Sequence, residues 1–126
     1  MSNLFHALKA GEPFTCPVSD SGTIWAQSVA RCAGNFVQAL TLDSALLSPT
    51  RAVTLPAQRV AMGDLAGEVA RQCGVCASLV SWQPDAELEV AFAAQPPLET
   101  RASENAGFAH DGDLATLVAS ALSTLA

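Results

Sequence analysis

The chain has 126 residues, half of them apolar and only 14% charged, with a formal net charge of −6. This length suits a single domain, and six basic residues spread along an acidic chain exclude an extended phosphate-binding track. No apolar run reaches the roughly 20 residues of a membrane-spanning helix, and His6 and Lys9 interrupt any signal-peptide core. We therefore expect a cytoplasmic domain, in which the low charge reflects either an ordinary alanine-rich composition or an apolar surface covered by a partner.

The first third of the chain predicts a helix, two strands and a second helix. The first helix, Ser2–Ala10, ends at Gly11, and short strands follow over residues 14–18 and 23–28. Ser28 is then the predicted N-cap of an amphipathic helix. The apolar residues of this helix follow helical spacing and form one face: Val29, Cys32, Ala33, Phe36, Val37 and Leu40.

The middle of the chain predicts two strands that alternate with helices. A strand over residues 51–55 ends at Pro56. A helix with a second apolar face follows and ends at Cys73, with Gly74 as the residue that terminates it. The next strand covers residues 77–82, and Pro84 fits the first turn of a short helix that continues through Phe92.

The last quarter predicts a short helix over residues 99–106, closed by Gly107, and a final helix capped by Asp111. The apolar face of the final helix is Leu114, Leu117, Val118, Ala121 and Leu125. The whole is a small mixed α/β fold with few short strands and about five to six helices. No glycine-rich turn joins a strand to a helix, so we expect no Rossmann dinucleotide-binding half within the chain.

The four cysteines include one close pair, Cys73 and Cys76. A redox Cys-x-x-Cys motif opens a helix, whereas Cys73 ends one. A zinc site needs two further ligands, and Cys16, Cys32 and the two histidines show no paired spacing. We therefore interpret the cysteines as structural thiols and predict no metal site and no catalytic residue in this chain.

Residues 3–118 resemble the C-terminal half of the extended short-chain dehydrogenases, the NAD-dependent epimerase/dehydratase family, and within it most closely the D-erythronate dehydrogenase branch. The matching segments occur in the family's order: Leu8-Lys9-Ala10-Gly11-Glu12, Cys16-Pro17-Val18, Trp25-Ala26-Gln27-Ser28, Arg51-Ala52-Val53-Thr54-Leu55-Pro56, Val80-Ser81-Trp82-Gln83-Pro84-Asp85 and Ala106-Gly107-Phe108. The sequence departs from this pattern where Val29 and Ala30 replace a Pro and the first Arg of a Ser-Pro-Arg-Arg segment, leaving Arg31.

The resemblance implies that residues 1–126 form a single substrate-binding domain, a fragment of a two-domain enzyme. In that family a Tyr, with a Lys four residues later, transfers the proton beside NAD. This chain contains no Tyr. The resemblance therefore implies an NAD-dependent oxidoreductase or epimerase/dehydratase as the parent enzyme, with NAD and the catalytic pair in the missing Rossmann half and no activity in this chain alone.

Five residues are the substrate-binding candidates that the resemblance indicates: Trp25, Ser28, Arg31, Trp82 and Arg101. An Arg fork holds a sugar-acid carboxylate and hydroxyl donors hold a polyol. Each candidate also has a structural interpretation. Ser28 is equally a simple N-cap, Trp25 a core aromatic residue, and Arg31 a solvated helix residue.

The expected partners are a small sugar-like substrate, such as a nucleotide sugar or sugar acid, and the Rossmann half or another chain that covers an apolar face. We predict that the helices over 29–40 and 111–125 expose this face. A homo-oligomer is a further expectation, and nucleic acid and membrane are not. The alternative function is a free-standing binding or interaction module without catalysis.

Overall fold

The computed structural model describes residues 2–125, which contain helices and short strands in the predicted order. The helices are α1 (Ser2–Ala10), α2 (Val29–Thr41), α3 (Met62–Cys73), α4 (Ala86–Phe92), α5 (Arg101–Asn105) and α6 (Leu114–Thr124), with 3₁₀ turns at Ser44–Leu46 and Ala77–Leu79. The strands are β1 (Phe14–Cys16), β2 (Thr23–Ala26), β3 (Gln58–Ala61) and β4 (Val80–Trp82). The predicted small mixed α/β class is thus confirmed.

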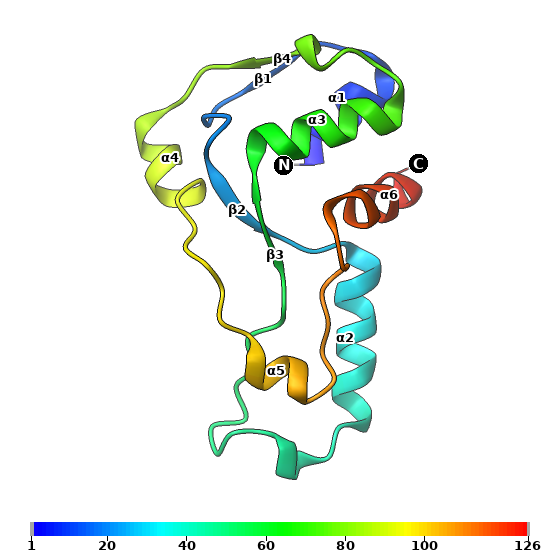
Figure 1. Ribbon diagram of the computed structural model, residues 1–126, viewed down its shortest axis with the longest axis vertical. Coiled ribbons are helices and arrows are strands. Elements are labelled where there is room, and N and C mark those ends of the chain that lie inside the picture. Colours follow the sequence, from blue (N-terminus) through cyan, green and yellow to red (C-terminus); the bar gives the residue numbers. More distant parts are fainter. Residues whose placement is uncertain (1, 126) are drawn as a thin grey trace.

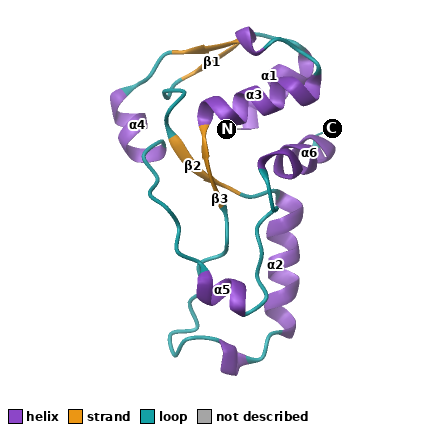
Figure 2. Cartoon of the chain, viewed as in Figure 1, coloured by secondary structure: helices purple, strands orange, loops and turns teal. Residues whose placement is uncertain are grey.

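The strands form two separate pairs (Figure 2). β1 and β4 run parallel, with Cys16 opposite Trp82. β2 and β3 run antiparallel, with Trp25 opposite Arg59. One edge of β2 is therefore paired with β3. The segment after α4 approaches the other edge of β2, where a single β-bridge joins Thr23 and Ala94.

The hydrophobic core lies among α1, α3 and α6 at one end of the molecule (Figure 1). α3 contributes the predicted apolar face, in which Leu65 and Val69 are buried, and packs against Leu4 and Leu8 of α1. The helix ends at Gly74, whose φ of 70° lies in the left-handed region that favours glycine. The prediction of Gly74 as the end of this helix is confirmed.

Helix α2 extends away from this core (Figure 1). Its predicted start is confirmed, because the Ser28 hydroxyl accepts a hydrogen bond from the backbone N–H of Arg31. Its apolar residues do not enter the core: Val29, Phe36 and Leu40 are all exposed, as predicted for this helix. The same prediction is wrong for much of α6, where Leu117 and Val118 are buried.

The predicted strand over residues 51–55 is wrong, since no strand lies between Arg51 and Ala57. Arg51 has a φ of 53°, which turns the chain out of the extended conformation. Pro56 removes a backbone donor, and the strand β3 begins two residues after it. A strand-like composition did not suffice here because a strand also needs a neighbour to pair with.

Several predicted boundaries move by one to three residues. Residues 77–79 form a 3₁₀ turn before β4, and β1 and β2 each end two residues early. Pro84 precedes α4 instead of lying within it, because the side chain of Asp85 caps that helix. The cap of α6 is Asp113, whose carboxylate accepts from the Thr116 N–H at 2.7 Å, and not Asp111. Within residues 2–125, no helix has the length and apolarity that crossing a membrane requires.

Candidate functional site

The junction between β2 and α2 is organised by a buried carboxylate. Asp111 is only 8% exposed, and its two oxygens accept from the backbone N–H of Ser28, at 2.9 Å, and from the Ser28 hydroxyl. The same hydroxyl accepts from the N–H of Arg31 at 3.1 Å. The single hydroxyl proton of Ser28 is thus committed to Asp111, and only a lone pair remains for any ligand.

Trp25 occupies the exposed side of β2 at the same junction. Its side chain is 41% exposed, and its indole N–H donates to the Pro96 carbonyl at 2.8 Å. The opposite residue on β3, Arg59, donates from Nε to the Gln95 carbonyl at 2.7 Å. Residues 95 and 96 are therefore fastened to β2 and β3 from two sides, and the indole ring is held in place beside the junction.

A groove with a volume of about 640 Å³ opens beside this junction. Its walls are mostly apolar and come from α1, β2, the start of α2, α3, α4 and α6 with the residue that follows it: Phe5, Ile24, Ala26, Val29, Leu65, Phe92, Leu117, Ala121 and Leu125. Neutral polar groups complete its lining: Ser2, Trp25, Gln27, Ser28, Gln95 and Thr124. A volume in this range suits a small organic ligand, and no charged side chain of residues 2–125 lines the groove.

The structure brings together two of the five predicted site residues, Trp25 and Ser28, on the wall of this groove. Arg31 is exposed and does not line it. Trp82 packs against the hydrophobic core from β4, and Arg101 is exposed at the start of α5. Neither residue lines the groove, so these candidates do not converge on one site. Whether any of the five contacts a substrate remains a prediction.

Several residues that line the groove are not among the site residues predicted from the sequence. Phe5, Phe92 and Thr124 come from three helices that are distant in the sequence, and only the packing of those helices unites them. Asp111 was misassigned because the residue that it binds, Ser28, lies 83 positions away. Gln27, next to Ser28, offered a local signal because polar residues at strand ends commonly face a site.

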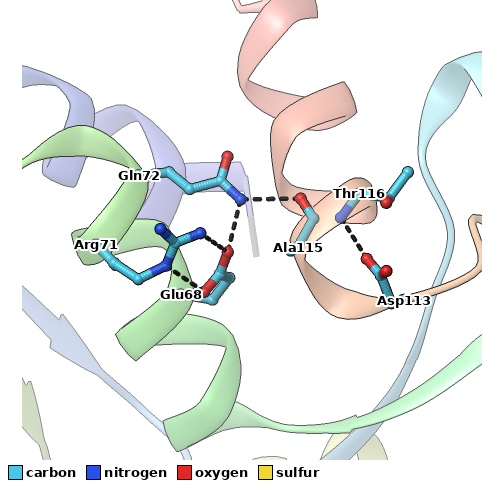
Figure 3. A network of polar contacts seen from close by, with 6 residues as sticks. All are labelled: Glu68, Arg71, Gln72, Asp113, Ala115 and Thr116. Atoms are coloured by element: carbon cyan, nitrogen blue, oxygen red, sulfur yellow. Dashed lines mark hydrogen bonds and ion pairs between the residues drawn. The ribbon is translucent and has the colours of Figure 1, made fainter.

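A second polar cluster lies between α3 and the start of α6 (Figure 3). Arg71 holds the Glu68 carboxylate with bonds of 2.8 and 2.6 Å, and the Gln72 amide joins Glu68 to the Ala115 carbonyl. The bonds from Arg71 and Gln72 lower the pKa of Glu68 to about 2. The Thr116 N–H likewise lowers the pKa of Asp113. The bond from Gln72 to Ala115 joins the two helices, the others lie within α3 or at the cap of α6, and we assign all of them a structural role.

The cysteines do not converge either. All four thiols are free, with Cys16 buried, Cys32 and Cys73 half-buried, and Cys76 exposed. Among residues 2–125, no group of three His, Cys, Asp or Glu side chains is placed to hold a metal ion.

The fold is similar to part of several solved epimerase and dehydrogenase structures. The chain superposes on a nucleoside-diphosphate-sugar epimerase from Agrobacterium tumefaciens with a TM-score of 0.78 and 20% identity, over 93% of this chain and 35% of the epimerase. It superposes on the apo form of a GalE-like L-threonine dehydrogenase from Cupriavidus necator with a TM-score of 0.81 and 17% identity, over 98% of this chain and 44% of the dehydrogenase.

A partial-consensus L-threonine 3-dehydrogenase gives a TM-score of 0.79 at 17% identity, over 96% of this chain and 39% of that protein. The chain thus spans less than half the length of each of these proteins. No protein-family model matches the sequence, and no curated protein matches it. At these identities the likeness establishes the fold, a small α/β unit found within epimerase and dehydrogenase structures.

Proposed function

We propose that this chain is the substrate-binding part of an NAD-dependent epimerase or dehydrogenase of the extended short-chain type. The observation that carries the proposal is the fold, because nearly the whole chain superposes on a minor part of such enzymes. The groove beside Trp25 and Ser28 supports it further, since it lies where the sequence resemblance indicates substrate contacts. In this proposal the chain positions a substrate, and a separate half performs the chemistry.

Cofactor binding does not fit the described residues. The junction of β2 with α2 contains no glycine, and β3 passes into α3 without a loop. The single glycine at that second junction, Gly63, packs against the Asp20 backbone, where an added Cβ would lie 3.2 Å from the carbonyl oxygen. Neither junction offers the glycine-rich turn that admits a pyrophosphate. We therefore place NAD in the other half and derive no step through it here.

Positioning is a sufficient task for such a domain, because fixing a substrate against its reaction partner can remove much of the activation barrier. The 126 residues contain no Tyr, so they cannot supply the Tyr-Lys pair of this family. The chain would instead offer apolar walls for the carbon skeleton and neutral groups for hydroxyls, among them Gln27, Gln95 and Thr124.

The lining of the groove favours the neutral sugar portion of a substrate over a free carboxylate. A buried carboxylate requires a cation or several donors, and Arg31 lies outside the groove. The narrower D-erythronate dehydrogenase assignment is retained as a proposal in which the carboxylate projects from the groove toward Arg31 or into the other half.

Calorimetric titration of the chain without cofactor tests this proposal. The ligands are a nucleoside-diphosphate sugar, a four-carbon sugar acid and L-threonine. We expect saturable binding of the nucleotide sugar or the sugar acid. Binding should be lost in Ala121→Trp, which fills the groove from α6, and retained in Ala119→Trp, which adds the same side chain at an exposed position of that helix.

The absence of binding for all three ligands, or equal binding by both variants, would contradict a substrate site in the groove. The alternative function is a binding or interaction module without catalysis. This alternative predicts that the chain binds its ligand but that adding a cofactor-binding half gives no NAD reduction. It also allows a stable association of the chain with another protein. The exposed apolar residues of α2, Val29, Phe36 and Leu40, support that alternative.

A further inference from the structure

Gln95 differs from the other amide on the groove wall in the hydrogen bonds of its side chain. The residue is half-buried and lines the groove, and its backbone is bonded to β2 and β3. Its side-chain amide, by contrast, makes no hydrogen bond to any group of residues 2–125. Two N–H donors and one carbonyl acceptor of Gln95 are therefore available to a molecule in the groove.

The backbone at Gln95 is fixed by the strands beside it. Its N–H donates to the Thr23 carbonyl at 3.1 Å, and its carbonyl accepts from the Thr23 hydroxyl at 2.9 Å and from Arg59 Nε at 2.7 Å. The next carbonyl, that of Pro96, accepts from the Trp25 indole N–H. A residue that precedes a proline also favours extended backbone. The Gln95 side chain thus starts from an ordered backbone, so that a ligand can bind it without ordering the loop.

Three other polar side chains of the groove have their hydrogens bonded within the chain. The Gln27 amide nitrogen donates to two backbone carbonyls, and the Thr124 hydroxyl donates to a third. The Ser28 hydroxyl donates to Asp111. What these side chains retain is acceptors, namely the amide oxygen of Gln27 and lone pairs on the two hydroxyl oxygens. Together with Gln95, they give the groove more acceptors than donors.

This balance favours a ligand that carries several hydroxyl groups. The acceptors need hydrogens from the ligand, and no charged side chain of residues 2–125 lines the groove to pair with an ionic group. Each hydroxyl supplies one hydrogen and can also accept one. Two hydroxyls on adjacent carbons therefore complement an amide, because one accepts from its N–H while the other donates to its oxygen. The edge of a uracil base has only a single N–H, which leaves the remaining acceptors without partners.

We propose that Gln95 determines specificity in the groove by binding two neighbouring hydroxyls of the substrate through the two ends of its amide. The inference rests on the proposed function, since it names the part of the substrate that the same groove recognises. Trp25, whose N–H is already bonded to Pro96, contributes an apolar surface instead.

Calorimetric titrations with UDP-glucose and with a four-carbon sugar acid test this role, each ligand being compared with its analogues that lack one hydroxyl. For the ligand that binds, two analogues that lack neighbouring hydroxyls should bind the parent chain about tenfold more weakly. Gln95→Leu should bind the complete ligand at least about tenfold more weakly, and loss of either hydroxyl should then change little further. Gln95→Glu, which keeps an acceptor and removes the donors, should still respond to the loss of one of the two hydroxyls.

Gln83→Leu is the matched control, because Gln83 is exposed and does not line the groove. This variant should bind every ligand as the parent chain does. Circular dichroism establishes that each variant is folded.

The possible failures are distinguishable. If neither ligand binds the parent chain, the proposed function and this inference fail together. If a ligand binds the parent chain and Gln95→Leu equally, this inference fails alone. An equal loss for the complete ligand and all its analogues in Gln95→Leu would also overturn it, because Gln95 would then act only on the shape of the groove. An equal loss for UDP without glucose would overturn it too, since the amide would then bind the base.

Discussion

Asp111 is the residue on which the β2–α2 junction depends. Its carboxylate satisfies two groups of Ser28 that the surrounding structure buries, since Ser28 is 3% exposed. A buried donor that loses its acceptor costs more than an exposed one, because water cannot replace the bond. The geometry of the groove wall at Ser28 therefore rests on a side chain from the opposite end of the chain.

Replacing Asp111 by Ala should lower the free energy of unfolding by about 1–3 kcal/mol, because the Ser28 N–H loses its acceptor within the structure. Asp111→Asn, which keeps one acceptor oxygen, should cost less. Urea denaturation followed by circular dichroism measures both. A loss in Asp111→Ala no larger than that of the exposed helix cap variant Asp113→Ala would contradict this role.

Cys76 is the most reactive thiol that the structure predicts. It is exposed, and the Ser78 hydroxyl donates to its sulfur at 3.0 Å. That bond lowers the pKa of the thiol and so raises the thiolate fraction at neutral pH.

We expect iodoacetamide to modify Cys76 before Cys16, Cys32 and Cys73, and Ser78→Ala to slow this reaction severalfold. Peptide mass spectrometry over a time course gives the order. Ser123→Ala, which removes a hydroxyl on α6, is the control. Faster modification of Cys32 or Cys73 would show that exposure and the Ser78 bond do not determine reactivity.

At the scale of elements, α3 and α6 are joined by a polar contact as well as by the core. Glu68 is held by Arg71, and Gln72 extends from Glu68 to the Ala115 carbonyl at the start of α6 (Figure 3). The pKa of Glu68 in the folded state, about 2, lies below the ordinary value of about 4.3 for an unfolded chain. Ionised Glu68 therefore favours the folded state above about pH 4, and this contribution disappears as the pH falls toward 2.

Glu68→Gln should lower the melting temperature at neutral pH, because the bonds to the ionised carboxylate are lost. The melting temperature of this variant should also fall less steeply between about pH 5 and pH 2, the interval in which Glu68 of the parent chain takes up its proton on unfolding. Thermal melts at a series of pH values measure this. Glu87→Gln, at an exposed carboxylate of α4, is the matched control. An acid limb that is unchanged in Glu68→Gln would mean that the contact with Arg71 and Gln72 contributes nothing.

The elements also show which features a sequence can predict. Ser28 and Gly74 were identified correctly because a helix cap and a left-handed terminus are decided by neighbouring residues. Asp111 and Asp113 both precede α6, and local rules favour either as its cap. Only the fold reveals that Asp111 is taken by Ser28.

Residues 51–55 illustrate the opposite case. Their composition is that of a strand, yet within residues 2–125 no neighbouring strand pairs with them, and the Ser103 hydroxyl binds the Thr54 carbonyl instead. β3 was missed because Gln58 and Arg59 look polar in sequence, whereas their backbone pairs with β2. Strand pairing joins distant residues and so lies beyond local pattern.

At the scale of the whole molecule, the two ends have different characters. α1, α3 and α6 enclose the core, whereas α2 extends away from it and hydrogen-bonds through Asn35 and Gln38 to the carbonyls of Ala109 and Ala106 (Figure 1). Val29, at the start of α2, lines the groove, whereas Phe36 and Leu40 lie exposed farther along the same helix.

Of the five substrate-binding candidates, Trp25 and Ser28 lie together on the groove wall, whereas Arg31, Trp82 and Arg101 lie elsewhere in the fold. Residues close together in the sequence, such as those at the junction of β2 and α2, lie close together in space whatever the rest of the fold does. Candidates from separate segments converge only if tertiary packing brings them together, and that information is not local.

A two-dimensional ¹H–¹⁵N NMR titration of the chain tests whether the groove beside Trp25 binds a substrate. A nucleoside-diphosphate sugar and a four-carbon sugar acid are added in turn. We expect saturable shifts of the Trp25 indole N–H and of the amides of Gln27, Ser28 and Gln95, while the Trp82 indole N–H stays unchanged. Shifts confined to other surfaces, or none with either ligand, would contradict it.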